Sequence, residues 1–190
     1  MHEASGALFN RPVESGTEHR APPGYTETIG RIEAAQESDV VERALAAARD
    51  RLKMDASYVT TIDPREQTIN AIVGGPDVVN RLHGAVVPVE QTFCRRMLDG
   101  EIPNVVPDTR AEPAIRDLAA ARAFRAYIGV PVRLSDGRVH GTLCCVSRST
   151  KFDMGPEDLR FMQVLAGIIG TRLDQVRGDM ARLTARFEPS

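Results

Sequence analysis

The sequence lacks several features that would narrow its function at once. No apolar run approaches the roughly 18 residues that a membrane-spanning helix needs. The formal net charge is −2, so the chain has no excess of basic residues with which to hold a nucleic acid. The N-terminus does not combine a basic start with an apolar core, as a secretory signal would. We therefore expect a cytoplasmic protein with no membrane and no nucleic-acid partner.

Cysteine is scarce, with three residues in 190. An odd number, two of them adjacent, gives no disulfide framework, which fits a reducing compartment. No Cys-x-x-Cys spacing is present, although zinc would need several converging ligands. Cys144 and Cys145 end an apolar stretch typical of a strand, where successive side chains point to opposite faces. We predict that both are buried residues, separated by the sheet itself.

Motifs for catalysis are also missing. The chain shows no paired carboxylates, no Ser-His-Asp order, no phosphate-cradling glycine loop and no metal-ligand cluster. We therefore expect neither an enzyme nor a metal site.

Three segments differ in composition. Residues 1–25 mix glycine, proline and polar residues without a period and predict a flexible tail. Residues 26–176 carry the periodic patterns of a folded domain, and residues 177–190 extend its last helix.

Within the domain, alternating and helical patterns predict the elements in order. Apolar residues from Val41 to Leu52 form one face of a helix that Asp39 caps at its start and that ends near Lys53. The later elements are a hairpin (56–62 and 68–75), a short helix or loop (76–83), an extended piece (85–89), a helix (90–100), an edge strand (102–108), a helix from Pro113 to Phe124, a hairpin around an Asp-Gly turn (125–149), and a long helix from Pro156.

The long helix has an apolar seam with alternating spacings of four and three, as in a heptad repeat. The seam comprises Met162, Ala166, Ile169, Leu173, Val176, Met180, Leu183 and Phe187. We interpret it as a parallel dimer helix; the alternative is a helix that folds back on its own domain.

Three stretches resemble the GAF domain family: "FCRRMLDGEIPNVVPDTRAEP", "YIGVPVRLSDGRVHGTLCCVSR" and "KFDMGPEDLRFMQVLAGIIGTRL". The resemblance runs from about residue 39 to 176. Its final part also looks like GAF modules that precede cyclic-di-GMP phosphodiesterase, cyclase or kinase outputs. It implies an α+β fold, with a six-stranded antiparallel sheet and helices on both faces. It also implies terminal helices that commonly dimerise, and a middle segment that encloses a small-ligand pocket.

The resemblance implies a sensory module that binds an unidentified small molecule and signals through its terminal helices to a partner protein. One of Cys144 and Cys145 would then face the pocket and the other the terminal helices. The residues we expect to line the pocket are Phe93, Asp108, Ile115, Phe124, Tyr127, Thr142 and Cys144. Asp108 has a second possible role, because its carboxylate can cap the following turn.

Other functions of the family stay open. The module could be a structural dimerisation unit without a ligand, or a thiol-dependent enzyme similar to free methionine sulfoxide reductases that uses Cys94. Such reductases carry a further cysteine that the stretch from Ile115 to Phe124 lacks. The cofactor is unknown: His83 is a candidate haem ligand, and Cys94 a candidate for bilin attachment, although Arg95 follows it where bilin-binding relatives often have histidine.

Overall fold

The computed structural model describes residues 25–187. The predicted tail therefore lies outside the described residues, apart from Tyr25, which begins a helix. The elements in chain order are α1 (Tyr25–Leu52), β1 (Ala56–Ile62), β2 (Glu66–Gly74), α2 (Pro76–Leu82), β3 (Val86–Pro88), the 3₁₀ helix η1 (Val89–Gln91), α3 (Phe93–Leu98), β4 (Val105–Val106), α4 (Ala119–Ala123), β5 (Ala126–Arg133), β6 (Val139–Ser147) and α5 (Pro156–Phe187).

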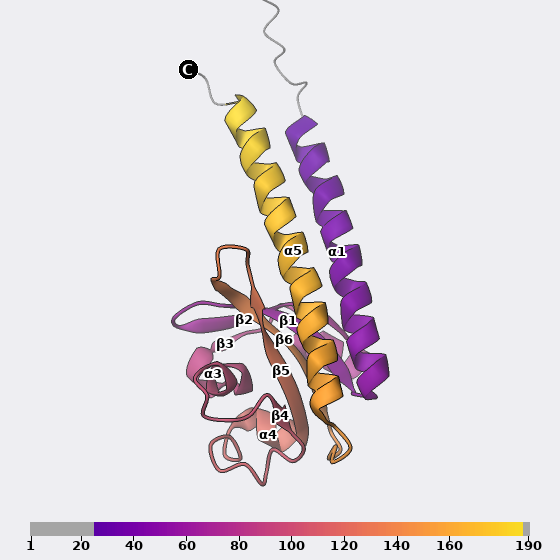
Figure 1. Cartoon of the computed structure of the whole chain (residues 1–190), viewed down its shortest axis with the longest axis vertical. Coiled ribbons are helices and arrows are strands. Elements are labelled where there is room, and N and C mark those ends of the chain that lie inside the picture. Colours follow the sequence, from indigo (N-terminus) through magenta and orange to yellow (C-terminus); the bar gives the residue numbers. More distant parts are fainter. Residues whose placement is uncertain (1–24, 188–190) are drawn as a thin grey trace, which may run out of the picture.

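The centre of the fold is one six-stranded sheet in the order β3-β2-β1-β6-β5-β4. Every neighbouring pair is antiparallel. Figure 1 shows α1 and α5 side by side over one face of the sheet, extending past its edge, while α3 and α4 lie on the other side. The α+β fold class and the edge position of the strand near Val105 are thus confirmed.

The alternation of side chains divides the core in two. Val59 and Leu143 are paired across β1 and β6 and belong to the cluster beneath α1 and α5. Their neighbours Tyr58 and Cys144 are also paired and belong to the cluster beneath α2, α3 and α4. Cys145 faces α5, where its Sγ lies 3.9 Å from Met162 Sδ. The prediction that the sheet separates the two adjacent cysteines is confirmed.

The terminal helices differ from the sequence predictions in two ways. The first helix runs unbroken from Tyr25, so Asp39 lies inside it and pairs with Arg43 (Nη2 to Oδ2, 2.6 Å) instead of capping its start. In α5, Met162 and Ile169 are fully buried against the chain's own sheet. The first half of the seam therefore packs within the domain, because the apolar sheet face offers it a partner; the side chains of Leu183 and Phe187 lie outside the described residues.

The segment after β4 is less helical than its composition indicates. Only Ala119–Ala123 form α4, whereas turns connect Thr109 to Asp117. Local backbone hydrogen bonds close these turns, such as that from Ile115 N to the Glu112 carbonyl at 3.2 Å. Thr109 Oγ1 also donates to the Phe124 carbonyl at 2.7 Å, which joins the two ends of the segment. The helix predicted from Pro113 is thus wrong over its first half, where the backbone forms separate turns.

Candidate functional site

A cavity of about 260 Å³ lies between the sheet and the segment that runs from α2 to α4. Its floor comes from β1, β2 and β6, and its walls come from α2, η1, α3 and α4. The residues that line it are Tyr58, Gln67, Ile69, Val78, Arg81, Leu82, Val87, Gln91, Thr92, Phe93, Cys94, Ala119, Ala120, Ala123, Phe124, Val146 and Arg148. Most of these side chains are apolar, as is usual for small-molecule sites.

Gln67 is the polar exception at the floor. Its register opposite Ile62 places it on the same sheet face as Ile69, and the residue is only 3% exposed. Its Oε1 is buried and has no hydrogen-bond partner among the described residues. An unpaired buried acceptor costs about 1–3 kcal/mol. A bound molecule with an N–H or O–H group would recover that cost.

Charged residues lie at the edge of the cavity. Arg81 is exposed, and Arg148 forms an ion pair with Asp77 of α2, which ties that helix to the end of β6. The hydrogen bond from Arg148 lowers the pKa of the Asp77 carboxyl. Arg148 is further fixed through its backbone N–H, which donates to Asp55 Oδ2 at 2.7 Å.

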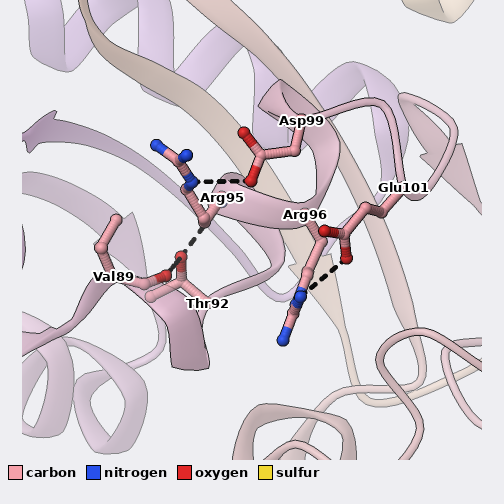
Figure 2. Close-up of polar contacts among 6 residues, drawn as sticks. All are labelled: Val89, Thr92, Arg95, Arg96, Asp99 and Glu101. Atoms are coloured by element: carbon pink, nitrogen blue, oxygen red, sulfur yellow. Dashed lines mark hydrogen bonds and ion pairs between the residues drawn. The ribbon is translucent and has the colours of Figure 1, made fainter. Parts of the chain in front are cut away.

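Helix α3 brings two side chains to the cavity and is held by polar contacts on its outer side (Figure 2). Thr92 caps it: Oγ1 accepts from Arg95 N at 3.1 Å and donates to the Val89 carbonyl at 2.8 Å. Arg95 pairs with Asp99, and Arg96 pairs with Glu101, each at 2.7 Å. Neither arginine lines the cavity, so both serve to hold the helix.

A chain of buried thiols and hydroxyls lies beneath α3. Cys94 Sγ is 3.3 Å from Cys144 Sγ, and Cys144 Sγ donates to Thr142 Oγ1, also at 3.3 Å. Thr142 Oγ1 in turn is 2.8 Å from Thr60 Oγ1. The two thiols differ: hydrogen bonding from Cys144 lowers the pKa of Cys94, whereas burial raises the pKa of Cys144. Only Cys94 lines the cavity.

Tyr127 fits into this layer because of a glycine. A Cβ at Gly129 would lie 2.0 Å from Tyr127 Oη and 3.1 Å from Cys144 Sγ. The absent side chain leaves room for the tyrosine hydroxyl, which lies 3.5 Å from Cys144 Sγ. The Tyr127 ring meets Phe93 edge to face, with centroids 5.4 Å apart, so β5 and α3 are packed directly together.

The predicted site residues divide into three groups. Phe93 and Phe124 line the cavity. Ile115, Tyr127, Thr142 and Cys144 are buried and lie on the same side of the sheet, but below the lining. Asp108 is absent from the lining: it pairs with Arg125 and accepts a backbone hydrogen bond from Arg110 N at 3.1 Å, which confirms its role in capping the turn. Whether any of them contacts a ligand stays a prediction.

Sequence reasoning missed much of the lining. Gln67 comes directly after the charged turn between β1 and β2, so its composition indicated a loop, although the strand begins at Glu66. The alternation of Gln67 with Ile69 was the signal that could have placed it on the pocket face. Tyr58 and Val146 lie in strands that the sequence predicts, so the same alternation could have placed them on the pocket face. His83, the candidate haem ligand, is exposed and does not line the cavity.

Residues 25–187 contain no group of three or more His, Cys, Asp or Glu side chains placed to hold a metal ion. Over the same residues, no helix combines the length and apolarity needed to cross a membrane.

Comparisons with known proteins agree with the fold. A sequence model described as the GAF domain matches residues 34–174. A cyclic di-GMP phosphodiesterase of Pseudomonas aeruginosa is 23% identical over 156 residues, which cover 80% of this chain but 25% of that protein. The chain thus spans about a quarter of the length of this curated relative.

Solved structures show the same architecture at low identity. The blue-light absorbing form of the PixJ GAF domain of Thermosynechococcus elongatus has a TM-score of 0.62 and 14% identity, over 80% of this chain and 94% of that one. The free methionine-R-sulfoxide reductase of Neisseria meningitidis, solved with its substrate, has a TM-score of 0.57 and 21% identity, over 81% and 89% of the two chains. These likenesses establish a shared fold.

Proposed function

Because this chain belongs to the GAF domain family, we propose that it is a non-enzymatic sensory module that binds a small molecule in the cavity. The observation that carries the proposal is the unpaired, buried Gln67 Oε1 at the floor of an otherwise mostly apolar cavity. A folded protein that keeps such a group without a partner gives up stability, and a ligand with a hydrogen-bond donor restores it.

The cavity defines what kind of molecule fits. Phe93, Phe124 and Ile69 offer an apolar surface for its body, and Gln67 offers an acceptor to its N–H or O–H group. Arg81 lies at the edge, where it can meet a negative group that stays in contact with water. The proposed ligand is therefore a small amphipathic molecule with a donor at its apolar end.

Signal transmission would use the terminal helices. Cys94 and Phe93 connect the cavity to the sheet, and the opposite face of the same sheet carries α1 and α5. A ligand shifts this packing only if it binds two arrangements with different affinity. We propose that α5 passes the shift to a second copy of the chain or to an output protein; homologues of the domain occur in signalling proteins.

The test replaces Gln67 with methionine, which keeps the length of the side chain and removes its amide. In the absence of ligand, we expect the free energy of unfolding of Gln67→Met to be about 1 kcal/mol higher than that of the wild type, because the substitution removes an unpaired polar group. A thermal-shift screen with a library of metabolites should find compounds that raise the Tm of the wild type but not of Gln67→Met. Native mass spectrometry of the full chain should show the same compounds bound.

Gln163→Met is the matched control, because Gln163 is exposed to solvent in α5 and does not line the cavity. This variant should keep both the stability and the ligand response of the wild type. If no compound raises the Tm of the wild type and its native mass is that of the chain without a ligand, a structural dimerisation module explains the protein better than a sensory module does.

A further inference from the structure

Cys94 and Cys144 form a pair of free thiols at the bottom of the cavity, and the sensory role described above does not use their chemistry. Their Sγ atoms are 3.3 Å apart, although 50 residues separate them in the chain. A disulfide bond measures about 2.05 Å, so the two sulfur atoms need to approach by about 1.3 Å. We propose that this pair is an oxidation site, in which a small hydroperoxide converts the two thiols to a Cys94–Cys144 disulfide.

The access route favours Cys94 as the thiol that reacts first. Cys94 lines the cavity, whereas Cys144 lies behind it. The cavity volume of about 260 Å³ is several times the roughly 30 Å³ that a water molecule occupies in the liquid, so hydrogen peroxide fits inside. Cys145, by contrast, faces α5 on the far side of the sheet and has no path to the cavity.

The environment divides the roles of the two sulfur atoms. Hydrogen bonding from Cys144 lowers the pKa of Cys94 and so increases its thiolate fraction, which is the form that attacks a peroxide. Burial keeps Cys144 protonated by raising its pKa. Cys144 is thus suited to the second step, where it lies within contact distance of the oxidised sulfur.

The two steps balance as follows. The Cys94 thiolate attacks one peroxide oxygen; an S–O bond forms, the O–O bond breaks, and the departing alkoxide or hydroxide takes up a proton as an alcohol or water. Cys94 is now a sulfenic acid. The Cys144 sulfur then attacks the Cys94 sulfur; the S–S bond forms, the S–O bond breaks, and the hydroxyl leaves as water with the Cys144 proton. Two thiols are oxidised by two electrons and one peroxide is reduced.

The structural consequence follows from where the two sulfur atoms sit. Cys94 is in α3 and Cys144 is in the central strand β6. A bond between them fixes α3 to the sheet. It also moves the neighbouring Phe93 and Thr92, both of which line the cavity, toward the sheet. Oxidation therefore alters the shape of the cavity whether or not a ligand is bound.

The experiment treats the reduced full chain with hydrogen peroxide, removes the peroxide, and then alkylates the remaining thiols with N-ethylmaleimide in guanidinium chloride, because all three cysteines are buried in the folded chain. Intact mass spectrometry should show a decrease from three alkylated thiols to one, and peptide mapping should show Cys94 joined to Cys144. The crosslinked protein should have a higher Tm than the reduced one, because the disulfide constrains the unfolded chain, and dithiothreitol should reverse the change.

Cys145→Ala is the matched control, since it removes the adjacent thiol on the other face of the sheet. In this variant both remaining thiols should enter the crosslink, so none is alkylated. Cys94→Ala should keep two alkylated thiols, whereas Cys144→Ala should keep only Cys145, with Cys94 oxidised but not crosslinked. Peptide mapping of the wild type decides the question even if one of these variants fails to fold.

Several results would overturn the proposal. Three alkylated thiols after treatment would show that peroxide does not oxidise the pair. A sulfinic acid at Cys94 without a crosslink would show that Cys144 does not reach it. Faster crosslinking by free methionine-R-sulfoxide than by peroxide would identify the pair as part of a reductase. By contrast, a wild type that no metabolite stabilises but that still forms the crosslink would refute the sensory role and support the oxidation site.

Discussion

The ion pair between Asp108 and Arg125 is a single-residue feature with a clear dependence on pH. Two hydrogen bonds join the side chains, at 3.0 and 2.7 Å, and Arg125 lowers the pKa of the Asp108 carboxyl. A carboxyl whose pKa is lower in the folded state stabilises the fold above its unfolded pKa of about 3.9. That stabilisation is lost as the pH falls through the folded value.

We therefore expect Asp108→Asn to lower the Tm at pH 7 by roughly a few degrees. The difference from the wild type should shrink as the pH falls from about 4 toward the lowered folded pKa of Asp108, where its carboxyl takes up a proton and the charge is lost. Asparagine still accepts the backbone hydrogen bond of Arg110, so the comparison isolates the charge. Thermal denaturation followed by circular dichroism from pH 7 to 3 measures the effect.

Asp136→Asn is the matched control for that series. Asp136 also pairs with a nearby arginine, Arg138, at 2.7 Å, but in an exposed hairpin turn. Exposed ion pairs contribute little, so this variant should change the Tm less at every pH. Equal effects for the two variants would show that burial does not distinguish the two pairs.

At the scale of elements, the contact between α5 and the sheet depends on a glycine. A Cβ at Gly170 would lie 2.2 Å from the carbonyl oxygen of Arg133 in β5. A side chain there would push the helix away from the strand, so the close approach explains why the buried side of α5 contains a poor helix former. Gly167, three residues earlier, has nothing within 4 Å of the same position.

We expect replacement by alanine to have opposite effects on stability at the two glycines. Gly167→Ala should stabilise the protein by about 0.5–1 kcal/mol, because alanine has the higher helix propensity and meets no neighbour. Gly170→Ala should destabilise it by about 1–3 kcal/mol through the clash with the backbone of β5. Urea unfolding of both variants measures the two free energies, and a stabilised Gly170→Ala would contradict the packing described here.

At the scale of the whole molecule, α5 leaves an apolar strip on its outer side. Val164 is 62% exposed and Ile168 is 48% exposed, and their spacing of four places them on one helix face. Our proposal that the terminal helices form a homodimer assigns this strip to a second copy. Ile168→Glu should then weaken the dimer at least tenfold, or about 1.4 kcal/mol, which light scattering coupled to size exclusion measures.

Phe152→Glu provides the control for the dimer. Phe152 is more exposed, at 76%, but lies in the loop before α5. Its replacement should leave the association unchanged. A wild type that is monomeric at all concentrations, or an equal effect of the two variants, would rule out this strip as the dimer contact.

Much of the fold could be predicted from the sequence because its strands carry local patterns. The β-branched run Ala56–Ile62 and the hairpin around Asp136-Gly137 give strands almost at the observed bounds. The segment from Thr109 to Phe124 could not be predicted in the same way, because its composition favours a helix, whereas its backbone forms successive turns before the short helix α4. The partner of the α5 seam could not be predicted for a related reason: a heptad spacing does not reveal whether its neighbour is a copy or the chain's own sheet, and the structure places the first half against the sheet.

The sequence by itself determined which face of a strand each side chain occupies, because alternation is a property of the local backbone. It thereby separated Cys144 from Cys145. Only the tertiary structure decided that Cys94 meets Cys144, that Gln67 Oε1 is buried without a hydrogen-bond partner among residues 25–187, and that a cavity separates α2 and α4 from the sheet. These features depend on pairing between segments far apart in the chain, and local patterns carry no information about which distant residues come into contact.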